Sequence, residues 1–254
     1  MATLALPGSA GVTAATAAQT LVVPYNDLAA LEAVFAEHPG EIAAVITEAA
    51  PCNMGVVTPA NEFNAEIRRL TQDSGALMIL DEVLTGFRVH EAGYWGLSNE
   101  HGEDWAPDLF TFGKVIGGGL PTAALGGRRE IMEHLAPTGP VYQAGTLSGN
   151  PVAMAAGLAT LKLADRIAYQ TINRRSEQLR AGLREAFDAA GLDYSLQEAG
   201  NLFSVAFGTR EHGVHDYADA KAQESFRYTP FFHAMLDAGV YLPPSVFEAW
   251  FLSC

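Results

Sequence analysis

The sequence has few of the features that mark secreted, membrane-spanning or nucleic acid-binding proteins. Only two cysteines occur among 254 residues, too few for a disulfide framework or a cysteine-rich zinc site, which favours a reducing, cytoplasmic location. No apolar run reaches the roughly 18 residues of a membrane span. Basic residues number 15 against 29 acidic ones, a net charge of −14. A protein with this net negative charge repels phosphate backbones and anionic lipids. We therefore expect neither nucleic acid nor membrane partners.

Several motifs are also missing. The apolar, alanine-rich residues 1–20 lack a basic leading stretch, which argues against a secretory signal peptide. The seven histidines show no metal-ligand spacing, so we expect no metal site. No GxSxG motif occurs and no GxGxxG motif follows a strand, which disfavours a serine hydrolase and a dinucleotide-binding enzyme.

What is present is an alternation of apolar strands with amphipathic helices. Hydrophobic residues make up 49% of the chain and charged ones 17%, enough for a sizeable core. Apolar runs predict buried strands at residues 42–47, 76–83 and 108–114, with a short strand at 123–126. Helices are predicted from Asn26 or Asp27, over residues 61–75 and from Arg128. This order predicts an α/β fold with parallel strands, whose ligand site lies beyond their carboxyl ends.

The last third of the chain differs in character. Long helices are predicted at residues 151–164 and 171–191, followed by an alternating, half-buried strand at 201–207, a helix at 227–239 and a short strand at 240–244. We therefore expect a large domain over residues 1–172 and a smaller α+β domain over residues 173–254. From the composition of its two ends we expect this sequence to be part of a longer chain.

Lys114 lies at the end of an apolar strand and before the glycine run 117–119, in FGKVIGGGLP. Burial there would favour a neutral amine, which can attack an aldehyde and form an imine. The glycines would let the backbone approach a flat ligand. The alternative is an ordinary surface lysine that precedes a loop.

Asp81 ends the apolar strand in LMILDEV. A carboxylate in this position suits the protonated ring nitrogen of pyridoxal phosphate, but would equally suit a metal, a helix cap or a ribose hydroxyl. Glu82 is expected to point to the other face and to make a structural contact.

In residues 142–151, Thr146 and the backbone could hold a phosphate, while Asn150 and Pro151 have the pattern of an ordinary helix cap.

The order of these segments is more specific than any one of them. LMILDEVLTGFRVHEAGYWG, then PDLFTFGKVIGGGLPTAALGGRREIME, then GPVYQAGTLSGNPVAMAAG resemble the class III pyridoxal phosphate-dependent aminotransferase family. Within it they are most similar to the glutamate-1-semialdehyde 2,1-aminomutases. The resemblance runs over nearly the whole chain and implies a fold-type I transferase, with an incomplete large domain and a smaller C-terminal domain.

The resemblance also implies roles. Lys114 would bind pyridoxal 5′-phosphate as a Schiff base and move protons, Asp81 would pair with the ring nitrogen, and Val83 would pack against the ring. Thr146 would reach the phosphate from the other subunit of a homodimer. The reaction would be an intramolecular amino exchange that converts a small substrate, glutamate-1-semialdehyde, into 5-aminolevulinate, the tetrapyrrole precursor.

Glu48 and Asn53 would face the hydroxyl edge of the cofactor, and Glu248 would lie on the substrate side. The chain departs from the family at Cys52 and Trp250, where the family usually has glycine, and the family's N-terminal portion is absent. We therefore expect residues 1–254 alone to be inactive. An aminotransferase that releases a keto product and a non-catalytic fragment remain the alternatives.

Overall fold

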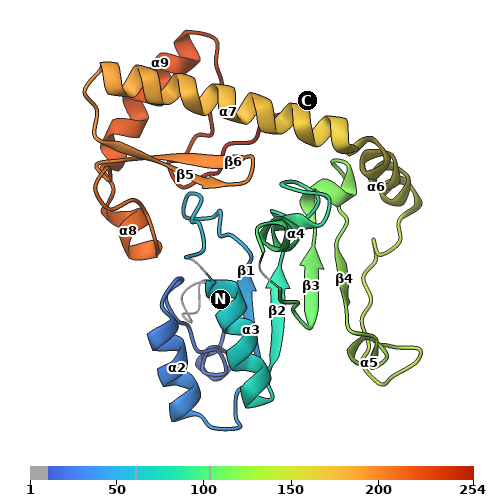
Figure 1. Cartoon of the computed structure of the whole chain (residues 1–254). Helices are drawn as coiled ribbons and strands as arrows, with labels where there is room; N and C mark the ends of the chain where they lie inside the picture. Colours follow the sequence, from blue (N-terminus) through green and yellow to red (C-terminus); the bar gives the residue numbers. More distant parts are fainter. Residues whose placement is uncertain (1–10, 61, 103) are drawn as a thin grey trace.

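The computed structural model describes residues 11–60, 62–102 and 104–254. A four-stranded sheet has the order β1-β2-β3-β4, and a two-stranded sheet pairs β5 with β6 (Figure 1). The strands of the larger sheet are β1 (Ala44–Glu48), β2 (Leu77–Asp81), β3 (Leu109–Phe112) and β4 (Ala124–Gly127). Those of the smaller sheet are β5 (Tyr194–Ala199) and β6 (Leu202–Phe207).

The first three strands are parallel, as predicted. β4 instead runs antiparallel to β3, because the short connection between them holds only a 3-10 turn, η1 (Lys114–Gly117), and no crossover helix. The helices of this half are α1 (Ala14–Ala17), α2 (Leu28–Glu37), α3 (Phe63–Ser74), α4 (Gly93–Glu100) and α5 (Arg129–Met132). Residues 1–10 of the expected N-terminal loop lie outside the described residues, and α1 was not predicted.

Local signals set the helix ends as the sequence indicates. The Asp27 side chain accepts the Ala30 N–H at 2.9 Å and caps α2. α3 ends at Gly75, whose φ of 72° lies in the left-handed region that glycine adopts without strain.

One face of the larger sheet packs on α3, with Met78 and Leu80 fully buried. The opposite face is open, since Ile46 is 57% exposed there.

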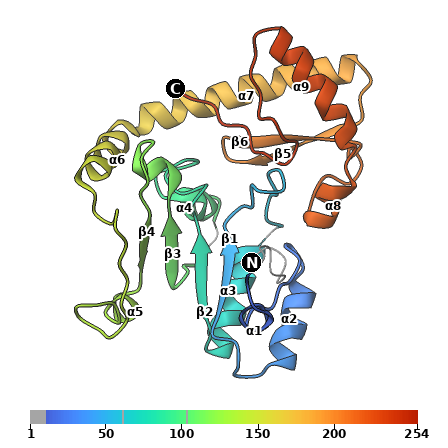
Figure 2. The same ribbon diagram turned by 180° about the vertical axis from the view of Figure 1, so that it is seen from behind.

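The second half contains further helices besides the smaller sheet. They are α6 (Pro151–Leu163), α7 (Arg166–Ala189), α8 (Tyr217–Ala222) and α9 (Tyr228–Asp237), with a 3-10 turn η2 (Ser225–Arg227). The expected domain boundary at residues 172/173 falls inside α7, which Figure 2 shows running from α6 across the smaller sheet. The predicted strand at residues 240–244 is wrong, because that stretch has no strand pairing.

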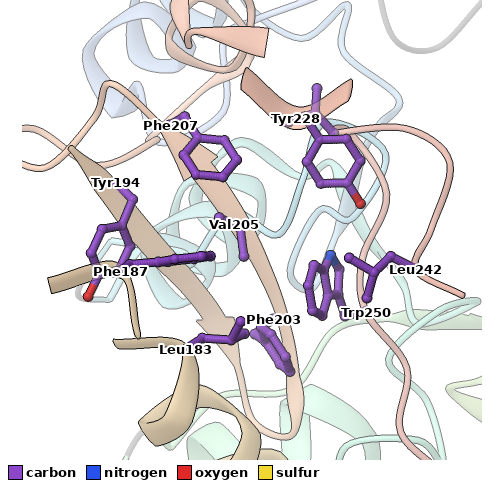
Figure 3. Close-up of a cluster of buried hydrophobic side chains, with 10 residues drawn as sticks. Leu183, Phe187, Tyr194, Phe203, Val205, Phe207, Tyr228, Leu242 and Trp250 are labelled. Atoms are coloured by element: carbon purple, nitrogen blue, oxygen red, sulfur yellow. The ribbon is translucent and has the colours of Figure 1, made fainter. Parts of the chain in front are cut away.

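Aromatic packing forms the core of this half (Figure 3). All six residues of β6 are buried, so the predicted half-buried alternation is wrong. Trp250 is 4% exposed and lies 5.2 Å from Phe203 between ring centroids. Its position in the core explains how the chain accommodates a large residue where glycine was expected. The cluster comprises Leu183, Phe187, Tyr194, Phe203, Val205, Phe207, Tyr228, Leu242, Val246 and Trp250.

Candidate active site

The candidate site lies at the carboxyl ends of three neighbouring parallel strands. Glu48 of β1 is in register with Asp81 of β2, and Asp81 is in register with Thr111 of β3. Register neighbours project to the same face of a sheet. Two carboxylates and a hydroxyl therefore form one row, which we call the strand-end row. The row lies on the face that α3 does not cover.

Lys114 follows β3 directly and begins η1. Its φ of 47° is in the left-handed region, which a non-glycine residue rarely adopts and which is a mark of functional positions. The residue is exposed, so the expected burial of this amine is not observed. In the described part of the chain the amine has no hydrogen-bond or ion-pair partner, which leaves it available to a ligand.

The glycine run after Lys114 serves packing more than ligand approach. Gly118 has a φ of 58°, and a Cβ there would lie 2.6 Å from the Ala156 carbonyl of α6. A Cβ at Gly157 would lie 2.2 Å from the Ile116 carbonyl. The turn therefore sits directly against α6, and only Gly119 faces open space.

The charges at the strand ends act on one another. Burial raises the pKa of the Glu48 carboxyl, and the negative charge of Asp81 raises it further, whereas the Lys114 ammonium lowers it. Glu48 accepts the Cys52 N–H at 3.3 Å and the Asn53 side-chain amide at 3.5 Å. Glu48, Asp81 and Lys114 thus lie within electrostatic reach of one another, although 66 positions of sequence separate the first from the last.

Asp81 is half-buried and has one oxygen engaged. Its Oδ1 accepts the Val83 N–H at 2.8 Å, and no described residue donates to Oδ2. Val83 is itself half-buried and lies 3.2 Å from the Cβ position of Gly113, beside Lys114. One carboxylate oxygen therefore remains for a cationic or N–H group of a ligand.

Glu82 makes the structural contact that the sequence predicts. The residue is fully buried, and its carboxylate accepts the Tyr94 N–H at 3.0 Å, the Trp95 N–H at 2.8 Å and the Thr85 hydroxyl. It caps the start of α4, and a Cβ at Gly93 would lie 2.6 Å from Glu82 Oε2. Burial raises the pKa of this carboxyl, against the opposing effect of these donors.

Four other expected residues lie outside the row. Thr146 is in an exposed segment between α5 and α6, and makes no hydrogen bond to the row within the described residues. Asn150 caps α6 by accepting the Val152 and Ala153 N–H groups. Asn53 is exposed but touches Glu48, and Glu248 is exposed in the C-terminal segment, where its N–H donates to the Ser245 carbonyl.

Two polar residues were missed by sequence reasoning. Thr111 Oγ1 is buried and lacks a hydrogen-bond partner among the described residues, although it stands beside Asp81 in the row. The available signal was a hydroxyl inside an apolar strand, three positions before Lys114. Asp108 is a structural anchor that accepts from Arg68 at 2.6 Å, Arg128 at 2.8 Å and the Met78 N–H at 2.8 Å.

The described residues show no group of three or more His, Cys, Asp or Glu side chains placed to hold a metal ion. No helix within the same ranges has both the length and the apolar character needed to cross a bilayer.

A mixed, mostly parallel sheet with an exposed lysine and a carboxylate at neighbouring strand ends fits the fold of an α/β transferase. The chain belongs to the class III aminotransferases, since the family model Aminotransferase class-III matches residues 1–246. It is 64% identical over 253 residues to the glutamate-1-semialdehyde 2,1-aminomutase of Cutibacterium acnes, covering 100% of this chain and 58% of that protein.

Solved structures agree with this membership. An omega-transaminase from Sphaerobacter thermophilus is 28% identical with a TM-score of 0.86, over 97% of this chain and 55% of that one. A glutamate-1-semialdehyde aminomutase from Pseudomonas aeruginosa PAO1, in complex with PMP, is 31% identical with a TM-score of 0.80. The match covers 96% of this chain and 55% of that one. The chain thus spans little more than half the length of these relatives.

Proposed function

We propose that this chain carries the cofactor-binding lysine of a pyridoxal phosphate enzyme that converts glutamate-1-semialdehyde into 5-aminolevulinate. The observation that carries the proposal is the 64% identity to an aminomutase over the whole chain. The positions of Lys114 and Asp81 at the ends of neighbouring strands support it. Because the chain spans 58% of that relative, the proposal concerns the reaction to which these residues contribute.

The residues of the strand-end row fit pyridoxal phosphate. When bound, this cofactor supplies an electron sink for the carbon next to the amino nitrogen. Lys114 offers to an aldehyde an exposed amine that has no partner among the described residues, and Asp81 offers to a protonated ring nitrogen the oxygen that does not bond Val83. Thr111 adds a buried hydroxyl that lacks a partner among the described residues and would gain one from a bound group.

The roles follow from these positions. Lys114 Nζ binds the cofactor covalently and moves a proton to and from the substrate carbon, for which a primary amine is both nucleophile and base. Asp81 holds the proton on the ring nitrogen. Val83, beside Asp81, packs against the ring face.

The remaining assignments lie around this centre. Glu48 and Asn53, which touch one another, face the hydroxyl edge of the cofactor. Glu248, exposed in the C-terminal segment, lies on the side of the substrate. The larger sheet with its helices, residues 1–172, forms the cofactor-holding domain, and residues 173–254 form a smaller domain that borders it.

The protein would act as a cytoplasmic homodimer, with Thr146 reaching the cofactor phosphate of the partner. Support for the dimer comes from the exposed apolar side chains of the segment around Thr146 and of α6. Support for the cytoplasm comes from two cysteines that are both free. The apolar side chains are Val141, Tyr142, Leu147, Val152, Met154, Leu158 and Leu161.

A class III aminotransferase that releases a keto product is the second candidate. The observation that favours it is the TM-score of 0.86 to an omega-transaminase. The two candidates use the same lysine and carboxylate, so they differ only in whether one molecule or two different molecules serve as amino donor and amino acceptor.

Two measurements test the proposal. Borohydride reduction of the protein with pyridoxal phosphate should fix the label on Lys114, and label on Lys162 or Lys221 without Lys114 would refute the assignment. Product analysis on the chain joined to an upstream segment of the Cutibacterium acnes relative should show 5-aminolevulinate from glutamate-1-semialdehyde. A keto product would favour the aminotransferase, and no label and no product would favour a non-catalytic fragment.

A further inference from the structure

The loop after β1 is fastened to the smaller sheet rather than to the larger one from which it emerges. Figure 1 shows this loop rising from β1 to the underside of β5 and β6. The Val56 N–H donates to the Ser204 hydroxyl of β6 at 2.8 Å, a buried bond between residues 148 positions apart. The Gly55 N–H donates to the Phe247 carbonyl at 2.7 Å. The Thr58 hydroxyl donates to the Glu198 carbonyl of β5 at 2.6 Å.

Apolar packing also joins the loop to β6, although the same clusters include Val89 and Tyr25 of the larger half. Val56 is fully buried in a cluster with Leu202 of β6 and Ala249, to which Val89 also belongs. Val57 is fully buried with Ala206 of β6 and with a group that comprises Val214 and Ala220. Neither valine joins the cluster that fills the space between the larger sheet and α3.

Over the few residues that follow Glu48, the backbone passes from contacts with the larger sheet to contacts with the smaller domain. Ala49 still belongs to the larger sheet, because its N–H donates to the Asp81 carbonyl at 3.0 Å and its carbonyl accepts from Asn64 at 2.9 Å. From Gly55 to Thr58 the hydrogen bonds described above join the loop to the smaller domain, whereas Cys52 packs in a cluster that contains Val89 as well as Leu202. The bonds from the Cys52 N–H and the Asn53 amide to Glu48, at 3.3 and 3.5 Å, therefore cross the junction between two differently anchored segments.

We propose that residues 52–57 move with the smaller domain as one body, and that Ser204 is the positioning residue that sets Cys52 and Asn53 against Glu48. Any displacement of the smaller domain then changes the two contacts to Glu48 at the strand-end row. Because the row is the cofactor site of the proposed function, the inference rests on that function for its consequence. It rests on the contacts alone for the mechanical coupling.

Ser204→Ala and Thr58→Val loosen the loop at its buried and exposed ends, and Ser195→Ala is the matched control. Ser195 lies on β5 of the same sheet and hydrogen-bonds Thr209 at 2.7 Å and Gln197 at 2.8 Å. The readouts on residues 1–254 are amide hydrogen exchange, compared between residues 52–57 and β2, and the dissociation constant for pyridoxal phosphate.

We expect Ser204→Ala to speed exchange at Val56 by about tenfold or more, as the loss of a buried acceptor implies, and to leave β2 unchanged. Thr58→Val should act in the same direction and Ser195→Ala should not. Cofactor affinity should fall in the two loop variants only. Equal acceleration in the loop and in β2, or none in the loop, would overturn the coupling, whereas loop acceleration with unchanged cofactor affinity would overturn the positioning role of Ser204. If neither the unmodified chain nor the chain joined to the upstream segment of the Cutibacterium acnes relative binds the cofactor, the proposed function fails, while the exchange data still decide the coupling.

Discussion

Glu48 and Asp81 stand in register at the carboxyl ends of adjacent parallel strands, with both carboxylates on the same face of the sheet. Like charges on neighbouring strands oppose ionisation. Burial raises the pKa of Glu48 and the charge of Asp81 adds to the rise. The pair is therefore a place where protonation depends on what occupies the strand-end row.

This pairing predicts a pH dependence of stability. A carboxyl whose pKa is raised in the folded state binds protons more readily there than in the unfolded chain. It therefore stabilises the fold below its unfolded pKa, near the ordinary 4.5, and this contribution disappears as pH rises through the folded pKa.

Glu48→Gln removes that titration, so the free energy of unfolding should fall less between pH 4.5 and neutrality than in the parent chain. Urea unfolding of both proteins across this range measures the difference, with Glu41→Gln as an exposed control. A variant with the same pH slope as the parent would show that Glu48 does not carry the raised pKa.

Asp81→Asn should abolish most of the activity without disturbing the fold. The amide keeps the shape and an acceptor for the Val83 N–H, but loses the charge that would hold the ring nitrogen protonated. We expect a loss of roughly 3–4 kcal/mol of transition-state stabilisation, as for other charged contacts in active sites. Steady-state kinetics on the chain completed with an upstream segment provide the test. Activity within about tenfold of the parent, or ~1.4 kcal/mol, contradicts the role.

Asp108→Asn should destabilise the protein strongly although Asp108 is outside the proposed site. Its buried carboxylate joins Arg68 of α3 to Arg128 beside β4. Removing one partner of a buried ion pair costs about 3–5 kcal/mol, and thermal unfolding should show it. An exposed pair such as Arg210–Asp188 provides a control, since D188N should cost less than about 1 kcal/mol.

The same carboxylate predicts acid sensitivity. Burial acts to raise the pKa of Asp108, but the Met78 N–H and the two arginines outweigh it and lower the pKa. The stabilisation is therefore present above the unfolded pKa near 3.8 and is lost as pH falls through the lower folded value. The free energy of unfolding of Asp108→Asn should therefore fall less steeply with falling pH in this range than that of the parent chain, and an equal slope would contradict this account.

Much of the fold could be predicted because local signals were sufficient. Apolar runs marked β1, β2 and β3, and Asp27 and Gly75 marked helix ends. β5 was missed because YSLQEA mixes polar and apolar residues and is a strand only through its pairing with β6. β6 is buried throughout because α7 packs near one side and the loop at residues 50–57 on the other. Such burial depends on residues distant in sequence, which periodicity cannot report.

The site divides in the same way. Lys114 and Asp81 were predictable because each ends an apolar strand. Thr111 was not, because only the register between β2 and β3 reveals that it stands beside Asp81. α4 was not predicted either, since its start is fixed by Glu82, which reaches the Tyr94 and Trp95 N–H groups from 12 and 13 positions earlier.

Thr146 provides a test of assembly. If Thr146 reaches the phosphate of the partner's cofactor, Thr146→Val should weaken cofactor binding by about tenfold, because a phosphate hydrogen bond is worth on the order of 1.5 kcal/mol. Light scattering with cofactor titration measures both properties, and Thr138→Val in the preceding turn is the control. Tight cofactor binding by a monomer, unaffected by Thr146→Val, would rule out the shared site.

The final prediction is that residues 1–254 alone form no 5-aminolevulinate. The face of the larger sheet that carries Glu48 and Asp81 is open, with Ile46 57% and Leu125 44% exposed. An open site leaves reacting groups in water, where charges and hydrogen bonds act far more weakly than in an enclosed site. The relatives contain further sequence, since the chain spans 58% of the Cutibacterium acnes aminomutase. Joining the missing part of that relative should therefore raise cofactor affinity and restore turnover together, whereas turnover at an ordinary enzymatic rate by residues 1–254 would show that the chain closes its own site.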